Sequence, residues 1–143
     1  MLGSPVREVL EPHKLIVAGP DASVDEAARR MRDGKVGAIL VVDEGRLIGI
    51  FTERDAVTRV IACGRDPAEV RLDEVMTRDP TTVTAEETFG YALLMMYERG
   101  FRHLPVVENG QPVGVVSARH ALDPELEEFA AEAERRKAIR RRA

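Results

Sequence analysis

The stretch GIFTERDAV, Gly49 to Val57, decides the fold because the chain carries a diverged second copy of it, GVVSARHAL, Gly114 to Leu122. In both copies a short apolar run reaches a hydroxyl residue and continues into a more polar segment. When the 143-residue sequence is shifted by 65 positions, residues 24–57 and 89–122 share eight identities, and most other pairs keep their polarity. Two copies are too few for a solenoid. We therefore expect a closed, pseudo-two-fold pair of repeats.

Each copy predicts the order β-α-β-β-α, so the expected fold class is mixed α/β (α+β). Ser23 is expected to cap a helix that Gly34 ends, and the matching helix of the second copy should end at Gly100. The runs VGAILVVD (36–43) and FRHLPVVE (101–108) are almost continuously apolar, which predicts strands covered on both faces. The dipeptides EG and NG then predict tight hairpin turns, and each return strand should lead into a last helix at Thr52 or Ser117.

Composition narrows the function classes. Apolar residues make up 44% and charged residues 32%, and VGAILVV is too short to span a bilayer, so we expect no membrane partner. The single cysteine, Cys63, is expected to pack as a small side chain, and one thiol indicates a reducing, cytoplasmic location. Residues 135–143 carry six cations and no acid, whereas the remainder has a net charge of −10. An acidic body argues against nucleic-acid binding.

The repeated unit, the strand end GIFTERD and the segment RHLPVV resemble a tandem pair of CBS domains, often called a Bateman module. The resemblance covers residues 6–122. It implies one CBS repeat over 6–64, a second over 72–122, and a C-terminal helix with a basic tail over 123–143. It also implies a regulatory module rather than an enzyme. Such modules bind AMP, ADP, ATP or S-adenosylmethionine in clefts between the copies, and they form disc-like homodimers.

Thr52 and Asp55 carry the most specific part of this resemblance. Thr52 lies where a strand should give way to a helix, and free backbone amides at that point suit a phosphate or a ligand hydroxyl. The carboxylate of Asp55, three residues later, can accept the hydroxyls of a ribose. The same Thr-x-x-Asp spacing is also a variant of the capping box, which needs no ligand. The small residues Gly37, Ala38 and Gly49 would let a planar base approach the backbone.

The resemblance implies two sets of ligand-binding residues. The first-repeat set is Val17, Gly37, Ala38, Ile39, Thr52 and Asp55. The second-repeat set, expected to be weaker, is Val83, Arg102, His103, Leu104, Pro105, Ser117 and His120. Arg54 and Arg119 are further candidates, and any of these arginines can equally be a solvated surface cation.

The second copy departs from the pattern at one decisive position. Ser117 keeps the hydroxyl, but His120 replaces the aspartate, so a strong acceptor for a ribose diol is missing. A histidine accepts one hydrogen bond through one ring nitrogen, or carries charge when protonated. The second cleft is therefore expected to be empty, altered in specificity, or suited to phosphate. The hypothesis is one good site and one weak site.

Two surfaces indicate partners. In the second-repeat helix, Leu94 and Met95 stand where the first copy has two arginines, and with Tyr91 they widen the apolar face. We expect a homodimer interface there, unless the module's own halves cover it. The C-terminal segment ELEEFAAEAERRKAIRRRA has helical spacing, with acids first and bases last. Docking of this helix on a partner subunit is preferred to nucleic-acid binding.

The leading hypothesis is a metabolite sensor that signals to an unknown protein target. The alternatives are a structural or dimerisation module without a ligand, the regulatory part of a larger catalyst, and a nucleic-acid-binding regulator. No phosphate loop occurs, and His13, His103 and His120 have no metal-ligand spacing, so no metal and no obligatory cofactor are expected.

Overall fold

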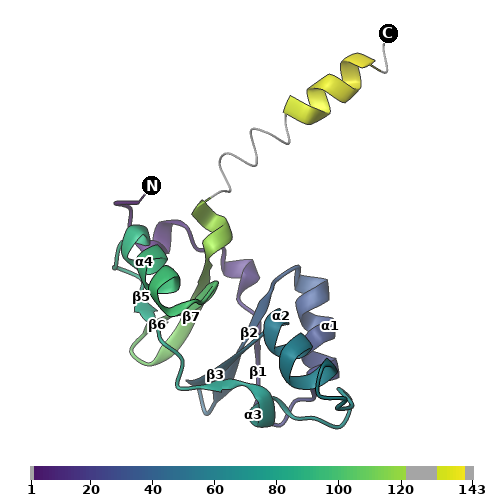
Figure 1. The fold of residues 1–143 in the computed structure, drawn as a ribbon. Helices are drawn as coiled ribbons and strands as arrows, with labels where there is room; N and C mark the ends of the chain where they lie inside the picture. Colours follow the sequence, from purple (N-terminus) through teal and green to yellow (C-terminus); the bar gives the residue numbers. More distant parts are fainter. Residues whose placement is uncertain (1, 122–131, 141–143) are drawn as a thin grey trace.

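The computed structural model describes residues 2–121 and 132–140, and it contains two small β-sheets with helices packed on them (Figure 1). From residue 6 to 61 the elements are 3-10 helices Val6–Glu8 and Pro12–Lys14, β1 Val17–Ala18, α1 Val24–Gly34, β2 Ala38–Asp43, β3 Arg46–Thr52, α2 Glu53–Asp55 and the π-helix Ala56–Ile61. From residue 72 to 121 they are α3 Leu72–Val75, β4 Thr77–Arg78, β5 Val83–Thr84, α4 Phe89–Arg99, β6 His103–Glu108, β7 Gln111–Ser117 and the 3-10 helix Ala118–Ala121. The mixed α/β class and the predicted β-α-β-β-α order are confirmed.

The two sheets repeat one topology. In the first, β1 is parallel to β2, β2 is antiparallel to β3, and β4 adds a short antiparallel edge. In the second, β5 is parallel to β6 and β6 is antiparallel to β7. Both hairpin turns have two consecutive residues with positive φ, at Glu44 and Gly45 (51° and 79°) and at Asn109 and Gly110 (53° and 78°). This is the type I′ geometry, which matches the twist of the flanking strands.

The helix ends follow the sequence with one exception. The Ser23 hydroxyl accepts a hydrogen bond from the Glu26 amide at 3.1 Å, as an N-cap does. Gly100 takes the left-handed conformation after α4, as predicted. Helix α1 ends at Gly34, as predicted, but the left-handed residue that follows is Lys35, with φ 55°, and not a glycine. Gly34 also allows a close approach, since a Cβ there would lie 3.1 Å from the Cδ1 of Ile16.

Strand β2 is covered on both faces, as its apolar run predicts. Ile39 and Val41 point into a core that they share with α1. Ala38 and Leu40 point the other way, into a cluster that includes Val115 of β7. The two sheets therefore pack against each other through these strands. A deeply buried surface holds the repeats together.

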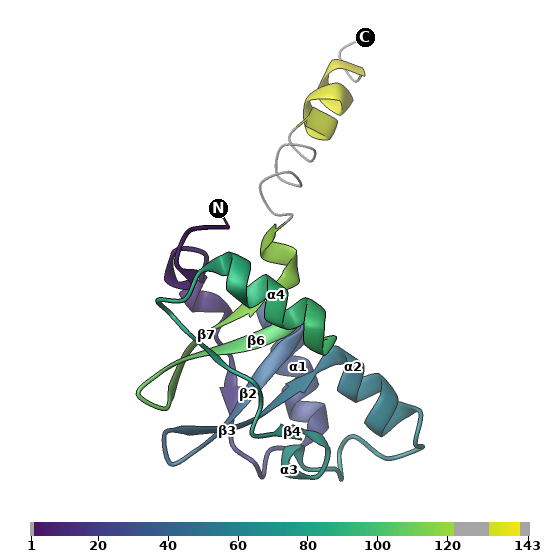
Figure 2. The same cartoon turned by 60° about the vertical axis from the view of Figure 1, so that its left-hand side comes forward.

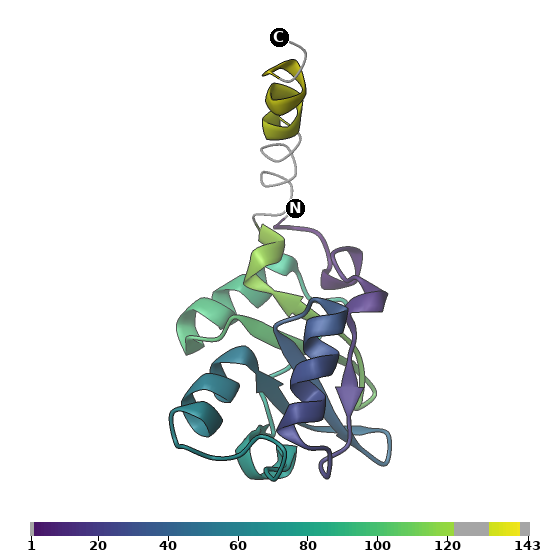
Figure 3. The same cartoon turned by 90° about the vertical axis from the view of Figure 1, so that its right-hand side faces the viewer.

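The two repeats also exchange their leading segments. Val6 is fully buried in the core of the second repeat, where its amide donates to the Glu87 carbonyl at 2.8 Å. Leu72 is fully buried in the first core, and its amide donates to the Ala22 carbonyl at 2.9 Å. Figures 2 and 3 show the consequence: α3 and β4 lie beside β3, and the purple N-terminal segment lies beside the green second repeat. Neither core is complete without the other repeat's leading segment.

Two smaller findings concern the rest of the chain. Cys63 is exposed, so the expectation that it packs inside is wrong; its Sγ donates to the Thr58 carbonyl at 3.5 Å. Residues 132–140 are helical, which confirms part of the expected C-terminal helix, and Glu132 pairs there with Arg135 and Arg136. The rest of 123–143 lies outside the described residues. None of the described helices is long and apolar enough to cross a membrane.

Candidate functional site

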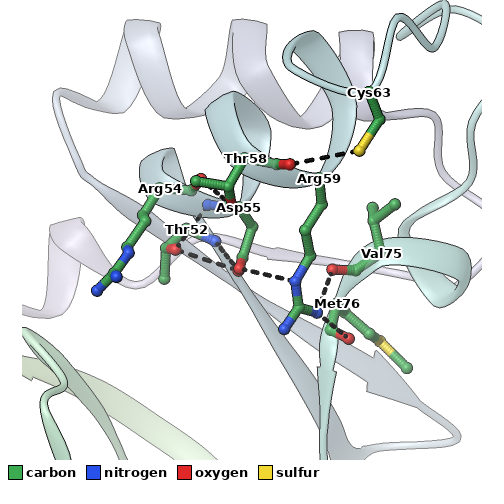
Figure 4. Close-up of polar contacts among 8 residues, drawn as sticks. All are labelled: Thr52, Arg54, Asp55, Thr58, Arg59, Cys63, Val75 and Met76. Atoms are coloured by element: carbon green, nitrogen blue, oxygen red, sulfur yellow. Dashed lines mark hydrogen bonds and ion pairs between the residues drawn. The ribbon is translucent and has the colours of Figure 1, made fainter.

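Thr52 and Asp55 form a complete capping box where β3 becomes α2 (Figure 4). The Asp55 Oδ2 atom accepts hydrogen bonds from the Thr52 amide at 3.0 Å and from the Thr52 hydroxyl at 3.1 Å. The Thr52 Oγ1 in turn accepts from the Asp55 amide at 3.3 Å. Asp55 is only 9% exposed, and among the described residues it is the one charged residue that is buried. The capping role that the Thr-x-x-Asp spacing predicted as an alternative to ligand binding is therefore present.

Arg59 ties the same carboxylate to the exchanged segment. Its Nε lies 3.6 Å from the Asp55 Oδ1, and its guanidinium donates to the carbonyls of Val75 and Met76 at 2.9 and 3.2 Å. The charge of Asp55 is thus partly balanced within the chain. Its Oδ1 accepts no hydrogen bond from any described residue, so lone pairs remain for a ligand hydroxyl.

Four of the six first-repeat candidates meet at one place. Ala38 pairs with Thr52 across the β2–β3 ladder, and the Glu53 amide donates to the Gly37 carbonyl at 3.0 Å. Gly37, Ala38, Thr52 and Asp55 therefore surround the same strand end. The Ile39 side chain does not join them, because it is fully buried in the first core. Val17 lies one strand away, paired with Leu40, and is 36% exposed.

The second repeat repeats this arrangement with histidine in place of aspartate. The His120 Nδ1 accepts from the Ser117 amide at 2.9 Å, which is the bond that Asp55 makes to Thr52. The Ala118 amide donates to the Arg102 carbonyl at 3.0 Å, as Glu53 does to Gly37. The His120 ring also meets Phe89 edge to face, with centroids 6.4 Å apart. His120 thus takes over the capping role, and its Nδ1 lone pair is used in doing so.

The other second-repeat candidates divide by burial. Arg102 is exposed, and His103, which pairs with Ser117 across the ladder, is half-buried. Val83, Leu104 and Pro105 are buried, and the first two belong to the second core. The exposed or half-buried members of the set are therefore its polar residues.

His103 lies where the strand ends of the two repeats meet. Burial lowers the pKa of His103, Glu53 raises it, and Arg102, Arg119 and His120 lower it further. A Cβ built on Gly37 would lie 3.0 Å from the Glu53 Oε1 and 3.1 Å from the His103 Nε2. Glu53 is therefore a member of the site that the sequence interpretation missed. Its position directly after the capping residue Thr52 is the feature of the sequence that could have indicated this role.

Gly49 has a different role from the one expected. A Cβ at Gly49 would lie 2.4 Å from the Met76 Sδ and 3.0 Å from the Thr77 carbonyl oxygen. The bare backbone at Gly49 admits the exchanged segment, which pairs with it through Arg78. The expectation that Gly49 opens space for a planar base is wrong, because that space is already filled.

A surface hollow of about 270 Å³ lies beside the site, between α1 and the start of α2. It is lined by Ala28, Met31, Arg32, Val36, Phe51, Glu53 and Ala56. The lining is mostly apolar, and Glu53, which lines the hollow, also lies above Gly37. Within residues 2–121 and 132–140, no three His, Cys, Asp or Glu side chains are placed to hold a metal ion.

Comparison with known proteins identifies this architecture. The CBS domain family matches residues 6–62 and 72–125. The CBS domain-containing protein CBSCBSPB2 of Arabidopsis thaliana is 39% identical over 110 residues, which is 76% of this chain. The chain spans only 20% of that relative's length. The crystal structure of an uncharacterized conserved protein from Pyrococcus horikoshii superposes with a TM-score of 0.80 at 29% identity, covering 87% of this chain and 94% of that one.

Two further similar structures contain ligands. The CBS domain pair of protein MJ0100, in complex with 5-methylthioadenosine and S-adenosyl-L-methionine, has a TM-score of 0.73 at 27% identity. It covers 82% of this chain and 96% of that one. The CBS domain protein PAE2072 from Pyrobaculum aerophilum, complexed with AMP, has the same TM-score at 26% identity, covering 81% and 88%.

Proposed function

The chain belongs to the CBS-domain family, and we propose that it binds an adenosine-containing ligand between its two repeats and signals that binding to a partner protein. The CBS pair is a regulatory module and not a catalyst. The proposed ligands are AMP, ADP, ATP or S-adenosylmethionine. The better site is the first-repeat strand end, and the site at Ser117 and His120 is the weaker one.

The observation that carries this proposal is the environment of Asp55. A nearly buried carboxylate sits at a helix N-terminus with one oxygen, Oδ1, that accepts no hydrogen bond from the described residues. Gly37 and Ala38 lie beside it, so backbone can approach a ligand closely there. Two similar CBS structures hold adenosine compounds, which supports the choice of ligand class. At the second site, the corresponding acceptor is a ring nitrogen already used by Ser117.

A structural or dimerisation module without a ligand is the second candidate. It is favoured by the same capping box, because Asp55 already caps α2 and pairs with Arg59. A residue with that many internal partners needs no ligand to explain it. The two functions therefore make opposite predictions about added ligand.

Thermal unfolding with a panel of AMP, ADP, ATP and S-adenosylmethionine tests the proposal. A ligand that binds only the folded chain stabilises it by RT ln(1 + L/Kd), where L is the free ligand concentration, so Tm rises with the logarithm of L once L exceeds Kd. We expect at least one compound to do so, and Asp55→Asn to lose most of that rise. The amide oxygen of Asn can still accept from the Thr52 amide, so the helix should remain capped.

Ser23→Ala is the matched control. It removes a cap of the same repeat on a different helix and should cost about 1 kcal/mol in the free energy of unfolding. Its ligand-induced rise in Tm should equal that of the wild type. If no compound raises Tm, the structural alternative holds. An equal rise in wild type and Asp55→Asn would place the ligand elsewhere.

The proposed partner of α4 is a second copy of the chain. Its outward face shows Tyr91, Leu94 and Tyr97, which are 45%, 51% and 86% exposed. At the equivalent places α1 shows the exposed charged residues Glu26, Arg29 and Arg32. Met95, the third residue expected in this interface, is half-buried against the second core and contributes less. One exposed thiol among the described residues fits a reducing compartment, so the cytoplasm is the proposed setting.

A further inference from the structure

Glu53 and His103 face each other across the repeat boundary without touching. Their Oε1 and Nε2 atoms lie 3.0 and 3.1 Å from the same point above Gly37, so no more than about 6 Å separates them. Among the described residues, neither atom makes a hydrogen bond or ion pair with the other. A single donor atom at ordinary hydrogen-bond distance from both would span that gap.

The Glu53 carboxylate only accepts hydrogen bonds, and the His103 Nε2 accepts in one of the two neutral tautomers. Burial lowers the pKa of His103, which keeps the ring neutral at neutral pH, and a neutral ring with its proton on Nδ1 presents Nε2 as an acceptor. The Glu53 carboxyl group has no cation within ion-pair distance among residues 2–121 and 132–140. Its charge is therefore less balanced than that of Asp55, which has Arg59.

The other charged and titratable groups that act on His103 belong to the second repeat. Arg102, Arg119 and His120 all act on His103. Arg32, which shares the neighbouring hollow with Glu53, is paired with Asp33 at 2.9 Å. On the first-repeat side, Glu53 thus presents a carboxylate without an ion-pair partner among the described residues, next to the residues proposed to hold the ribose.

We propose that Glu53, with His103, determines the charge class of the ligand at the first-repeat site: the site selects an adenosine compound that presents an amine or ammonium donor, and it disfavours a phosphate. This rests on the proposed function and adds the specificity of the same site. Gly37 contributes to this selectivity, because any side chain there would occupy the space between Glu53 and His103.

Coulomb's law gives the expected size of the effect of Glu53 on ligand affinity. A phosphate oxygen about 6 Å from an unbalanced carboxylate is disfavoured by at least about tenfold in affinity, even at the effective dielectric constant of a protein surface. An ammonium group at the same place is favoured by a similar factor. Salt at physiological strength reduces both effects but does not abolish them at this separation.

Calorimetric titration of the full chain with S-adenosylmethionine, 5-methylthioadenosine and AMP measures this selectivity. S-adenosylmethionine carries a sulfonium and an ammonium group beside one carboxylate and so has a net positive charge, 5-methylthioadenosine carries no charge, and AMP carries a phosphate. We expect the wild type to prefer S-adenosylmethionine to AMP. Glu53→Gln should shift the ratio of the two affinities at least about tenfold towards AMP and leave 5-methylthioadenosine nearly unchanged.

Asp43→Asn is the charge-matched control. It removes one exposed carboxylate from the opposite end of the β2–β3 hairpin and should not change the ratio. Gly37→Ala, whose Cβ meets only the movable ends of two side chains, should weaken S-adenosylmethionine more than 5-methylthioadenosine while the chain stays folded. An unchanged ratio in Glu53→Gln, or an equal change in Asp43→Asn, overturns the inference but not the proposed function. Failure of all three compounds to bind overturns both.

Discussion

At the residue scale, one substitution separates the two repeats. Asp55 and His120 make the same hydrogen bond to the amide of a capping hydroxyl residue, although one is an anion and the other a ring. The sequence could predict both N-caps, since hydroxyl residues stand at the ends of matching strands. It could not predict that His120 would keep the capping role, because that depends on how the ring packs against Phe89.

His103 makes the stability of the fold depend on pH. Its pKa is lowered mainly by burial, so the folded chain releases the His103 proton at a lower pH than the unfolded chain, in which histidine has its ordinary pKa near 6.5. Put as proton counts, the unfolded chain binds more protons between the lowered pKa and about 6.5. The free energy of unfolding therefore rises with pH through this window and is lost as the pH falls through it.

Urea unfolding from about pH 5 to about pH 8 measures this dependence. His103→Gln should flatten the pH profile relative to the wild type, because glutamine does not titrate. Every other titratable group remains in both proteins, so the difference between the two profiles reports the loss of His103. Parallel profiles for the two proteins would show that His103 titrates equally in the folded and unfolded chains.

At the element scale, local rules account for most of the fold. The hairpin turns, the Ser23 cap and the Gly100 stop all appear where turn and cap chemistry predicts them. The rules gave Gly49 the wrong role and did not reveal the packing role of Gly34, and both for one reason. Both glycines are needed where another part of the chain approaches closely, Ile16 in one case and Met76 with Thr77 in the other. Such contacts come from tertiary packing, which a single sequence does not reveal.

The two long helices end in the same conformation with different residues, which gives a matched test. Lys35 has a left-handed φ of 55°, which costs conformational energy for a residue with a Cβ. Gly100 has a φ of 73°, which a glycine adopts without that cost. Lys35→Gly should raise the free energy of unfolding by about 0.5–1 kcal/mol, and Gly100→Ala should lower it by about 1 kcal/mol. The hydrogen bond from Lys14 goes to the Lys35 carbonyl and survives the change. Urea denaturation that gave the same sign for both variants would contradict this explanation.

At the scale of the whole molecule, the repeats are interlocked rather than merely adjacent. Val6 completes the second core and Leu72 completes the first, so each repeat depends on chain that precedes the other. The internal repeat in the sequence reveals the pair, but the exchange cannot be read from it, because a short apolar turn fits either core equally well. The interlocking places the two strand ends, with Glu53 and His103, opposite each other.

The assembly of the molecule is tested at α4. Leu94→Arg introduces the residue that the first repeat has at the matching position, and its exposed site should tolerate the change within the monomer. Light scattering at micromolar concentration should give twice the chain's mass for the wild type and a single chain's mass for the variant. Asp43→Asn adds the same unit of charge elsewhere and should remain dimeric. A monomeric wild type would contradict the proposed interface.

The central claim is that the carboxylate of Asp55 holds the sugar of an adenosine ligand. The most direct measurement is a crystal structure of the chain grown with saturating S-adenosylmethionine, read at the first-repeat strand end. The account predicts both ribose hydroxyls within hydrogen-bond distance of the Asp55 carboxylate, with the capping bonds from Thr52 intact. A crevice beside Thr52 that holds only solvent, or a ligand whose sugar lies at His120 instead, would contradict it.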